Sequence, residues 1–543
     1  MTHPPDDALV SSPSTDNELG GPRSTSYDAL PYESHPYEKS HPDHLAALGH
    51  LFGVDRPRVE GCRVLELGCA AGGNLIPQAV AAPERTFVGV DLSRRQLEEG
   101  WRLIEQLGLK NVELRHQDMI DFEVTPGEFD FILCHGVYSW VARPVQDKIL
   151  QICGEGLAPQ GIAYISYNTY PGWYLRGMVR QMMCFHARQF DDPQKQVEQA
   201  RALLDFLTNT GPLGDPTYHT LLCRELEILK NRADSYLYHE HLEEENEPLF
   251  FYQFIDRAAA HGLKYLSETQ FSEMVPGNFS AQAEETLREL GIGMVQSEQY
   301  LDFLRNRTFR RTLLCHDDLE LNRQLGPEQL KRLYVGCQLR PNSERIDVSS
   351  DSELQFVSPG GVGVTVSQPL VKSAMLQLGE IWPNLVLFDS LPALAHEGLG
   401  APLVRDAANF ARDLADLGSL VLELYAADLI ELGVSPPRFR TSVSDRPQSS
   451  PLARLQAERV PYVTNLRHEV VHLTDLQVRL AKLLDGTRDR EALCDALQAA
   501  VNAGELVVDR YGQPLSDEDA RGFLLELIDR DLQNLVGMAL LIA

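Results

Sequence analysis

Short apolar runs alternate with amphipathic stretches between about residues 63 and 167 of the chain. The runs are rich in β-branched and aromatic residues and predict five strands, at 63–68, 86–91, 112–117, 129–135 and 161–167. Helical periodicity between them predicts helices at about 72–82, 93–107 and 144–157. Strands without an alternating polar face are typical of a parallel sheet covered on both faces. The pattern therefore predicts an α/β, doubly wound, Rossmann-like fold.

A long helical pattern follows, over roughly 173–261, and then two more apolar runs at 262–266 and 308–315. We expect these runs to be the sixth and seventh strands of the same sheet. The helical insertion would then lie over the edge at which parallel sheets bind ligands.

The remaining chain predicts smaller modules. Strands near 344–348, 353–357 and 362–365, with helices at 368–380 and 403–417, indicate an α+β module. Helices around a possible wing strand at 506–510 indicate a winged-helix-like module. The predicted division is a disordered tail at 1–24, a core at 25–172, a helical region completing the sheet at 173–318, a middle module at 325–432, a Pro/Ser/Arg-rich linker at 434–451 and a C-terminal module at 452–543.

Three tyrosines among prolines, Tyr27, Tyr32 and Tyr37, precede a predicted helix at 41–52. Aromatic residues at this density predict packing against another part of the protein. Two alternatives remain open, a strap over the domain surface and a lid over a ligand.

Composition narrows the function classes. With 543 residues the chain is too long for a single core. A net charge of −29 argues against nonspecific nucleic-acid binding and favours a cationic partner. No apolar run reaches the length of about 18 residues that would predict a membrane span. Nine cysteines without C-x-x-C pairs predict reduced thiols and a cytoplasmic location. The apolar end, 536–543, predicts burial in the chain's own core or in a homodimer.

The first predicted strand runs directly into a glycine-rich turn, in which Glu66 is followed by Gly68, Cys69, Ala70 and Gly72. The second strand ends in Asp91, 23 positions after Gly68. Glycines in such a turn allow close approach of a nucleoside, and the acidic residue can bind ribose hydroxyls. The turn could also be a structural strand–helix junction. It resembles the E/D-x-G-x-G-x-G turn of class I S-adenosylmethionine-dependent methyltransferases, with Ala70 in place of the middle glycine.

Longer phrases resemble one family, the bacterial protein lysine methyltransferases with a methyltransferase regulatory domain, as known in rickettsiae. They are residues 74–77 (NLIP), 89–93 (GVDLS), 134–140 (CHGVYSW), 166–173 (SYNTYPGW), 239–243 (HEHLE), 262–266 (GLKYL), 463–468 (VTNLRH) and 484–488 (LDGTR). The resemblance covers nearly everything after Tyr27. It implies S-adenosyl-L-methionine as cofactor and a protein lysine as methyl acceptor.

The expected cofactor contacts follow the strand ends. The turn residues Gly68, Cys69, Ala70 and Gly72 would border the methionine portion, with Glu66 near its ammonium group. Asp91 would bind the ribose hydroxyls and Leu92 would contact the adenine. Asp118 and Met119, after the third strand, would meet the adenine edge and face. The alternative for Asp118 is a helix N-cap.

The fourth strand ends in His135 and Tyr138 rather than in [D/N]-P-P-Y, which counts against a nucleic-acid base or amide acceptor. Only about one lysine in two thousand is neutral at pH 7, so a lysine site must deprotonate its substrate. Tyr138, Tyr167 and Asn168 are candidates to accept hydrogen bonds from the amine, and His135 is a candidate proton acceptor. Two other functions remain open, a small-molecule N- or O-methyltransferase and a non-catalytic cofactor-binding regulator.

Two charged clusters predict no site. His239 and His241 lie among glutamates, but helical positions i and i+2 do not share a face, so no metal is predicted. Arg305, Arg307, Arg310 and Arg311 predict a solvated strand edge rather than a nucleic-acid site.

Overall fold

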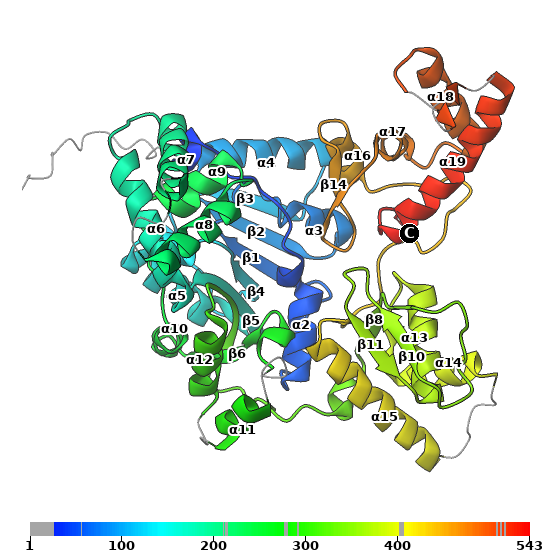
Figure 1. Ribbon diagram of the computed structural model, residues 1–543, viewed down its shortest axis with the longest axis horizontal. Helices are drawn as coiled ribbons and strands as arrows, with labels where there is room; N and C mark the ends of the chain where they lie inside the picture. Colours follow the sequence, from blue (N-terminus) through cyan, green and yellow to red (C-terminus); the bar gives the residue numbers. More distant parts are fainter. Residues whose placement is uncertain are drawn as a thin grey trace, which may run out of the picture.

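A seven-stranded sheet forms the centre of the computed structural model (Figure 1). The structure describes residues 26–542 except 56, 210, 212–214, 276–280, 290–292, 401–406, 507–508, 511–512 and 515–516, so the predicted tail at 1–24 lies outside it. The strand order is β3-β2-β1-β4-β5-β7-β6. The strands are β1 (Arg63–Leu67), β2 (Thr86–Asp91), β3 (Val112–His116), β4 (Phe129–Cys134), β5 (Leu157–Asn168), β6 (Leu263–Glu268) and β7 (Phe309–His316). β1 to β5 pair in parallel, and β7 is antiparallel to both neighbours. The predicted doubly wound sheet and its two late strands are confirmed.

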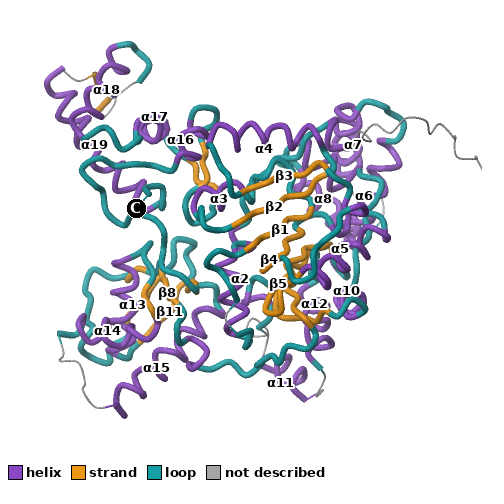
Figure 2. Tube along the Cα trace, turned by 180° about the vertical axis from the view of Figure 1, so that it is seen from behind, coloured by secondary structure: helices purple, strands orange, loops and turns teal. Residues whose placement is uncertain are grey.

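Alternate residues of each strand enter two different cores. Val64 and Tyr164 face the core beneath α2 (Pro42–Leu51), whereas Leu65 and Ile165 face the core beneath α5 (Arg143–Gly156) and α10 (Phe251–Ala259). The first core continues without a break into the middle module, and α2 lies between the sheet and that module (Figure 2). The helices of the sheet are α2 (Pro42–Leu51), α3 (Ile76–Ala81), α4 (Arg94–Leu107), α5 (Arg143–Gly156), α10 (Phe251–Ala259), α11 (Ala281–Glu289) and α12 (Met294–Arg305).

The helical insertion has a small apolar core of its own. It contains α6 (Gly172–Ala187), α7 (Pro193–Asn209), α8 (Pro216–Leu229), α9 (Asp234–Leu237) and the π-helical turn η4 (Tyr238–Leu242). These helices lie beyond the carboxyl ends of the parallel strands, near the start of α4 (Figure 1). The insertion is therefore at the edge of the sheet where ligands of such folds bind.

In its described residues the middle module holds two three-stranded sheets and three α-helices. The strands are β8 (Tyr334–Cys337), β9 (Arg340–Pro341), β10 (Leu354–Val357), β11 (Gly363–Val366), β12 (Val386–Leu387) and β13 (Ile430–Gly433), and the helices are α13 (Pro369–Ile381), α14 (Leu391–Gly398) and α15 (Ala407–Ala426). The prediction of a strand at 344–348 was wrong. This segment is a loop, and the Asp347 carbonyl turns inward to accept from Lys372 Nζ at 2.8 Å. The same Nζ donates to the backbone oxygens of Ser350 and Ser352 just beyond it, at 2.6 and 2.9 Å.

The C-terminal module combines helices with two short hairpins. It contains α16 (Pro451–Ala457), β14 (Tyr462–Thr464), β15 (Val470–His472), α17 (Asp475–Leu483), α18 (Arg490–Asn502), β16 (Asp509–Arg510), β17 (Gln513–Pro514) and α19 (Asp517–Gly537). β16 falls within the predicted wing strand, of which 507–508 lie outside the described residues. Leu540 and Leu541 are buried in the module's own core, so the apolar end needs no second copy to cover it. Within the described residues, no helix is both long and apolar enough to cross a membrane.

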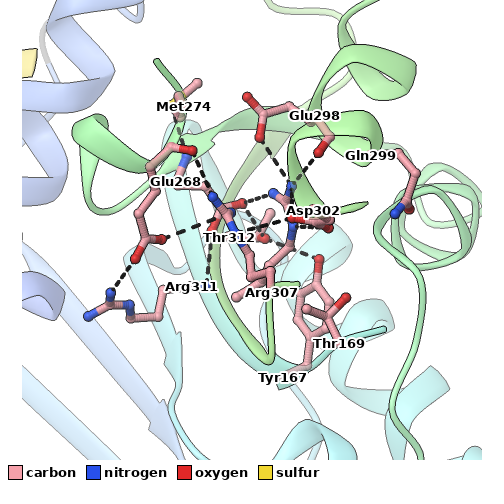
Figure 3. A network of polar contacts seen from close by, with 12 residues as sticks. Tyr167, Thr169, Glu268, Met274, Glu298, Gln299, Asp302, Arg307, Arg311 and Thr312 are labelled. Atoms are coloured by element: carbon pink, nitrogen blue, oxygen red, sulfur yellow. Dashed lines mark hydrogen bonds and ion pairs between the residues drawn. The ribbon is translucent and has the colours of Figure 1, made fainter. Parts of the chain in front are cut away.

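The arginines around β7 are not a solvated edge, which corrects the prediction. Arg310 is 0% exposed, and its guanidinium contacts Glu268 at 2.6 Å, Asp302 at 2.9 Å and Glu298 at 3.1 Å. Figure 3 shows these three carboxylates in one polar network. β7 lies between β5 and β6 in the sheet. The Arg310 side chain contacts α12, which supplies Glu298 and Asp302, two of the three carboxylates. The arginine-rich segment therefore joins the last two strands to their covering helix.

Candidate active site

The turn after β1 has the left-handed conformation that a glycine-rich ligand cradle requires. Gly68, Ala70 and Gly72 have φ values of 78, 50 and 75°. A Cβ built on Gly68 would lie 2.3 Å from Val137 Cγ2, so only glycine fits there. Ala70 keeps the conformation although it is not glycine, because its backbone N–H donates to Asp91 Oδ2 at 2.8 Å.

Asp91 lies at the carboxyl end of β2, as predicted. Its Oδ1 accepts from the backbone N–H of Ser93 at 2.8 Å, and burial raises its pKa. Each carboxylate oxygen retains capacity for a further hydrogen bond, so Asp91 can still accept from two ribose hydroxyls. Leu92 and Ile120 are exposed apolar residues next to the ends of β2 and β3, an arrangement that suits a flat aromatic ligand.

Asp118 and Met119 follow β3 at the same edge. Asp118 Oδ1 accepts from the backbone N–H of Ile120 at 3.0 Å, so the alternative role as a cap is present in the structure. Met119 is half-buried, with its Cε 3.6 Å from the position a Cβ of Gly68 would occupy. Met119 therefore borders the glycine turn.

Glu66 is buried, and its two side-chain oxygens differ in their hydrogen bonding. Its Oε1 accepts from Asn74 Nδ2 at 2.9 Å, whereas Oε2 has no hydrogen-bond partner among the described residues. Burial raises the pKa of Glu66 to about 8, and Asp91 acts in the same direction. A buried carboxylate oxygen beside the glycine turn fits the ammonium group of the predicted cofactor.

The N-terminal tyrosine segment crosses the carboxyl ends of the strands. Ser34 Oγ accepts from the backbone N–H of Gly73 at 2.8 Å, and the backbone N–H of Tyr37 donates to Asn74 Oδ1 at 3.0 Å. Gln96 of α4 donates to the Tyr32 carbonyl at 2.8 Å. The segment is thus fixed directly over the glycine turn.

The other side of this segment is held by the helical insertion. The Tyr27 ring stacks on His239 with centroids 4.1 Å apart, and His239 Nε2 lies 2.6 Å from the Leu30 carbonyl. His239 Nδ1 lies 2.8 Å from Glu243 Oε1. Both ring nitrogens therefore have protein partners, and no group of three or more potential metal ligands is present in the described part of the chain.

His135 lies where Tyr37 meets the sheet. Its ring is packed between Tyr37 and Tyr164, with centroids 3.6 and 5.7 Å away, and Nδ1 contacts the Tyr164 hydroxyl. Burial, with a contribution from Arg311, lowers the pKa of His135 to about 3. The ring is therefore neutral and poorly suited to take up a proton near pH 7.

Tyr138 and Tyr167 lie on the opposite face of the sheet from Tyr164. Both belong to the core beneath α10, where their rings pack on Phe254 with centroids 5.3 and 4.1 Å away. Tyr167 Oη lies 3.2 Å from Thr312 Oγ1. The structure does not bring these two hydroxyls to the side occupied by His135 and Tyr37.

Asn168 occupies the last position of β5. Its backbone N–H donates to Ser139 Oγ at 2.9 Å, and its Nδ2 donates to Asn246 Oδ1 at 3.2 Å. The side-chain oxygen of Asn168 can accept further hydrogen bonds. Trp140 packs on Trp173 and Tyr170 packs on Tyr174, with ring centroids 6.0 and 4.2 Å apart.

Glu240, in η4, was not predicted as a site residue. Burial raises its pKa to about 7, opposed by Arg176 and His239. Burial also raises the pKa of Tyr32 and Tyr37, and the charge of Glu240 adds to this effect in both. The adjacent His239 lies 4.1 Å from the Tyr27 ring and 5.9 Å from the Tyr32 ring between centroids, so η4 packs against the tyrosine segment. The only sequence signal was the acidic run from 240 to 247 itself.

Three family models match the chain. Residues 58–205 match a methyltransferase domain, residues 233–316 a predicted methyltransferase regulatory domain, and residues 445–540 a PKMT C-terminal winged helix domain. The protein RP789 of Rickettsia prowazekii is 36% identical over 524 residues, which cover 95% of this chain and 93% of the relative.

Solved structures agree with this match. PKMT2 from Rickettsia typhi, solved in complex with AdoHcy, superposes with a TM-score of 0.85 at 30% identity, covering 94% of this chain and all of that one. A shorter match, 30% identical over 111 residues, is to the ubiquinone biosynthesis O-methyltransferase of Actinobacillus pleuropneumoniae and covers 20% of this chain.

Proposed function

The chain belongs to the family of S-adenosylmethionine-dependent methyltransferases that includes PKMT2 of Rickettsia typhi, and we propose that it N-methylates lysine side chains of protein substrates. The proposed acceptor follows from the family and from the groups around Glu240.

The residues at the strand ends match the parts of the cofactor. Glu66 Oε2 would bind the ammonium group, the turn from Gly68 to Gly72 would border the methionine portion, and Asp91 would accept from the ribose hydroxyls. Leu92 and Met119 would contact the adenine. Bound S-adenosylmethionine supplies an already activated methyl group, so the protein mainly has to orient the acceptor and exclude water.

The single observation that carries the lysine assignment is the packing of η4 on the tyrosine segment, where His239 contacts the rings of Tyr27 and Tyr32. The adjacent Glu240 has a pKa that burial raises to about 7. A lysine ammonium must lose a proton before it can attack, and a carboxylate that titrates near neutral pH is suited to accept it. Tyrosine rings can hold the cation while it enters. In this arrangement His135 fixes the ring of Tyr37, and Asn168 is a second hydrogen-bond acceptor for the amine.

The test is to incubate the protein with methyl-labelled S-adenosylmethionine and cell extract, and to identify labelled amino acids after complete hydrolysis. Labelled methyllysine, absent with Asp91→Ala and strongly reduced with Glu240→Gln, supports the proposal. Glu244→Gln is the matched control, because this neighbouring glutamate is exposed. Label confined to small molecules would indicate a small-molecule methyltransferase. No label despite cofactor binding would indicate a regulator.

A further inference from the structure

A hairpin of the C-terminal module reaches the methyltransferase core at the glycine turn. His468, at the tip between β14 and β15, lies against Asn74, which in turn binds Glu66. We propose that His468 is a positioning residue for the cofactor-binding carboxylate of Glu66, acting through Asn74. The C-terminal module is then a part of the cofactor site. This inference rests on the assignment of Glu66 to the cofactor ammonium group.

The hydrogen bonds define the orientation of each group. His468 Nε2 lies 2.7 Å from Asn74 Oδ1, and the backbone N–H of Tyr37 donates to the same oxygen at 3.0 Å. Because a backbone N–H can only donate, this atom of Asn74 is the acceptor oxygen, and His468 must contribute an Nε2–H. The amide nitrogen of Asn74 is thereby directed to Glu66 Oε1, at 2.9 Å.

Burial makes these hydrogen bonds, from His468 through Asn74 to Glu66, sensitive to the loss of any one side chain. Glu66 and Asn74 are each 2% exposed, and His468 is 4% exposed. Buried hydrogen-bonded groups lose more free energy than exposed groups when a partner is removed. Without the imidazole, Asn74 Oδ1 keeps only the Tyr37 N–H and a longer contact of 3.3 Å to Ser40 Oγ. The amide is then less constrained, and so is the carboxylate that it orients.

The hairpin tip is rigid enough to act as such a support. His468 has a left-handed backbone, with φ of 65°. Asn465 Oδ1 accepts from the backbone N–H groups of Arg467 and Glu469 at 3.0 and 2.8 Å, and its Nδ2 donates to the Met538 carbonyl at 3.0 Å. The tip is therefore fixed to the end of α19.

The middle module holds the same tip from another direction. The guanidinium of Arg467 lies over the Trp382 ring, 4.3 Å from its centroid, and forms an ion pair with Glu431. In Figure 1, β14 lies beside α3, the helix that follows the glycine turn. The position of His468 thus depends on both the middle module and the C-terminal module. Through Asn74, these two modules influence how Glu66 is oriented toward the cofactor.

The experiment compares two ligands in direct binding measurements. AdoHcy carries the amino-acid portion that Glu66 would bind, whereas methylthioadenosine has the same nucleoside and thioether without it. We expect His468→Ala to weaken AdoHcy binding about tenfold and to leave methylthioadenosine binding unchanged. His468→Gln should restore most of the affinity, because its amide can also donate to Asn74.

Controls separate this role from simple docking of the module. Arg459→Ala removes another contact between the same module and the core, at 3.3 Å to Gln106 of α4, and should change neither affinity. In the Asn74→Ala background, His468→Ala should cause no further loss of AdoHcy affinity, because His468 acts on Glu66 only through Asn74. If His468→Ala does not fold, His468→Asn replaces it, because the shorter amide does not reach Asn74.

Two results would overturn the proposal. Equal weakening of both ligands would show that His468 supports the fold in general, and unchanged binding of both would show that it supports nothing at this site. Glu66→Gln tests the cofactor contact separately from the role of His468. If Glu66→Gln weakens AdoHcy binding but His468→Ala does not, only the role of His468 fails. If Glu66→Gln has no effect, the cofactor assignment itself fails.

Discussion

The backbone N–H of Ala70 donates to Asp91 Oδ2 at 2.8 Å, which joins the turn after β1 to the acidic end of β2. This bond holds a non-glycine residue in the left-handed region, with φ of 50°. It also orients the carboxylate that would bind the ribose. One interaction therefore shapes both the methionine side and the ribose side of the proposed cofactor site.

Asp91→Ala is expected to weaken AdoHcy binding by at least tenfold, because two charge-assisted hydrogen bonds and the support of the turn are lost together. Isothermal titration calorimetry measures the effect. Asp118→Ala is the control at the next strand end, where the carboxylate caps Ile120 and a smaller loss is expected. Undiminished affinity of Asp91→Ala would contradict the assignment.

Cofactor binding near pH 7 is expected to release a proton from Glu66. Its pKa of about 8 in the free protein means that the carboxyl is mostly protonated at pH 7. A neighbouring ammonium group lowers that pKa, so binding favours the ionised form and should tighten as pH rises toward 8. Titrations of AdoHcy in buffers of different ionisation enthalpy count the protons. Glu66→Gln should abolish the release, and a release unchanged by that substitution would refute the role.

Glu240 should set the pH dependence of methyl transfer. Below its pKa of about 7 the carboxyl is protonated and cannot accept a proton from lysine, so kcat/KM for the acceptor should rise with pH through about 7. Glu240→Gln should remove this rise and lower kcat/KM about a hundredfold at pH 7.5. A profile that keeps its rise near 7 in the variant would show that another group titrates.

The tyrosine segment should slow cofactor release. Tyr27 stacks on His239 with an angle of 3° between the rings, and the adjacent Asp28 accepts from Ser93 Oγ at 2.8 Å, two positions after Asp91. Tyr27 therefore lies near the proposed ribose end of the site. Tyr27→Ala should increase the dissociation rate of AdoHcy several-fold, since aromatic pairs contribute about 1 kcal/mol. Tyr27→Phe keeps the stack and should behave like the parent in stopped-flow measurements. Equal rates in all three proteins would exclude a covering role.

The convergence of the residues proposed to bind the cofactor could be predicted, because each of them lies at or just after the end of a strand. A buried strand is a local apolar run, and parallel strands bring their carboxyl ends to one edge, so Glu66, Asp91 and Met119 converge without knowledge of the rest of the fold. The packing of the tyrosine segment on the insertion could not be predicted in this way. Tyr27 and His239 are far apart in the sequence, and only the folded insertion brings their rings to 4.1 Å between centroids.

Side-chain direction explains the other differences. Tyr164 and Tyr167 are three positions apart on β5, so they point to opposite faces, and the register of the whole sheet decides which face is the site. The arginine-rich sequence predicts a solvated edge, but Arg310 is buried because α12 supplies Glu298 and Asp302. Charge patterns in one strand do not indicate the partners that another element provides.

The buried network around Arg310 yields the prediction on stability. Arg310→Met would leave Glu268, Glu298 and Asp302 buried without their shared cation, although Arg307 still contacts Asp302 at 3.1 Å. Removal of one partner from a buried ion network destabilises proteins by about 3–5 kcal/mol. We expect a lower urea midpoint for the transition that unfolds the sheet.

Arg115→Met is the matched control for this prediction. Arg115 forms an exposed ion pair with Glu113 at 2.9 Å on β3, and loss of such a pair changes the free energy of unfolding by less than about 1 kcal/mol. Burial of Glu298 already raises its pKa to about 7, so loss of the cation should raise it further. A protonated Glu298 is less costly to bury, and Arg310→Met should therefore regain part of its stability as pH falls from 8 to 6. Equal urea midpoints for the two variants would show that the network is not an important support of β6 and β7.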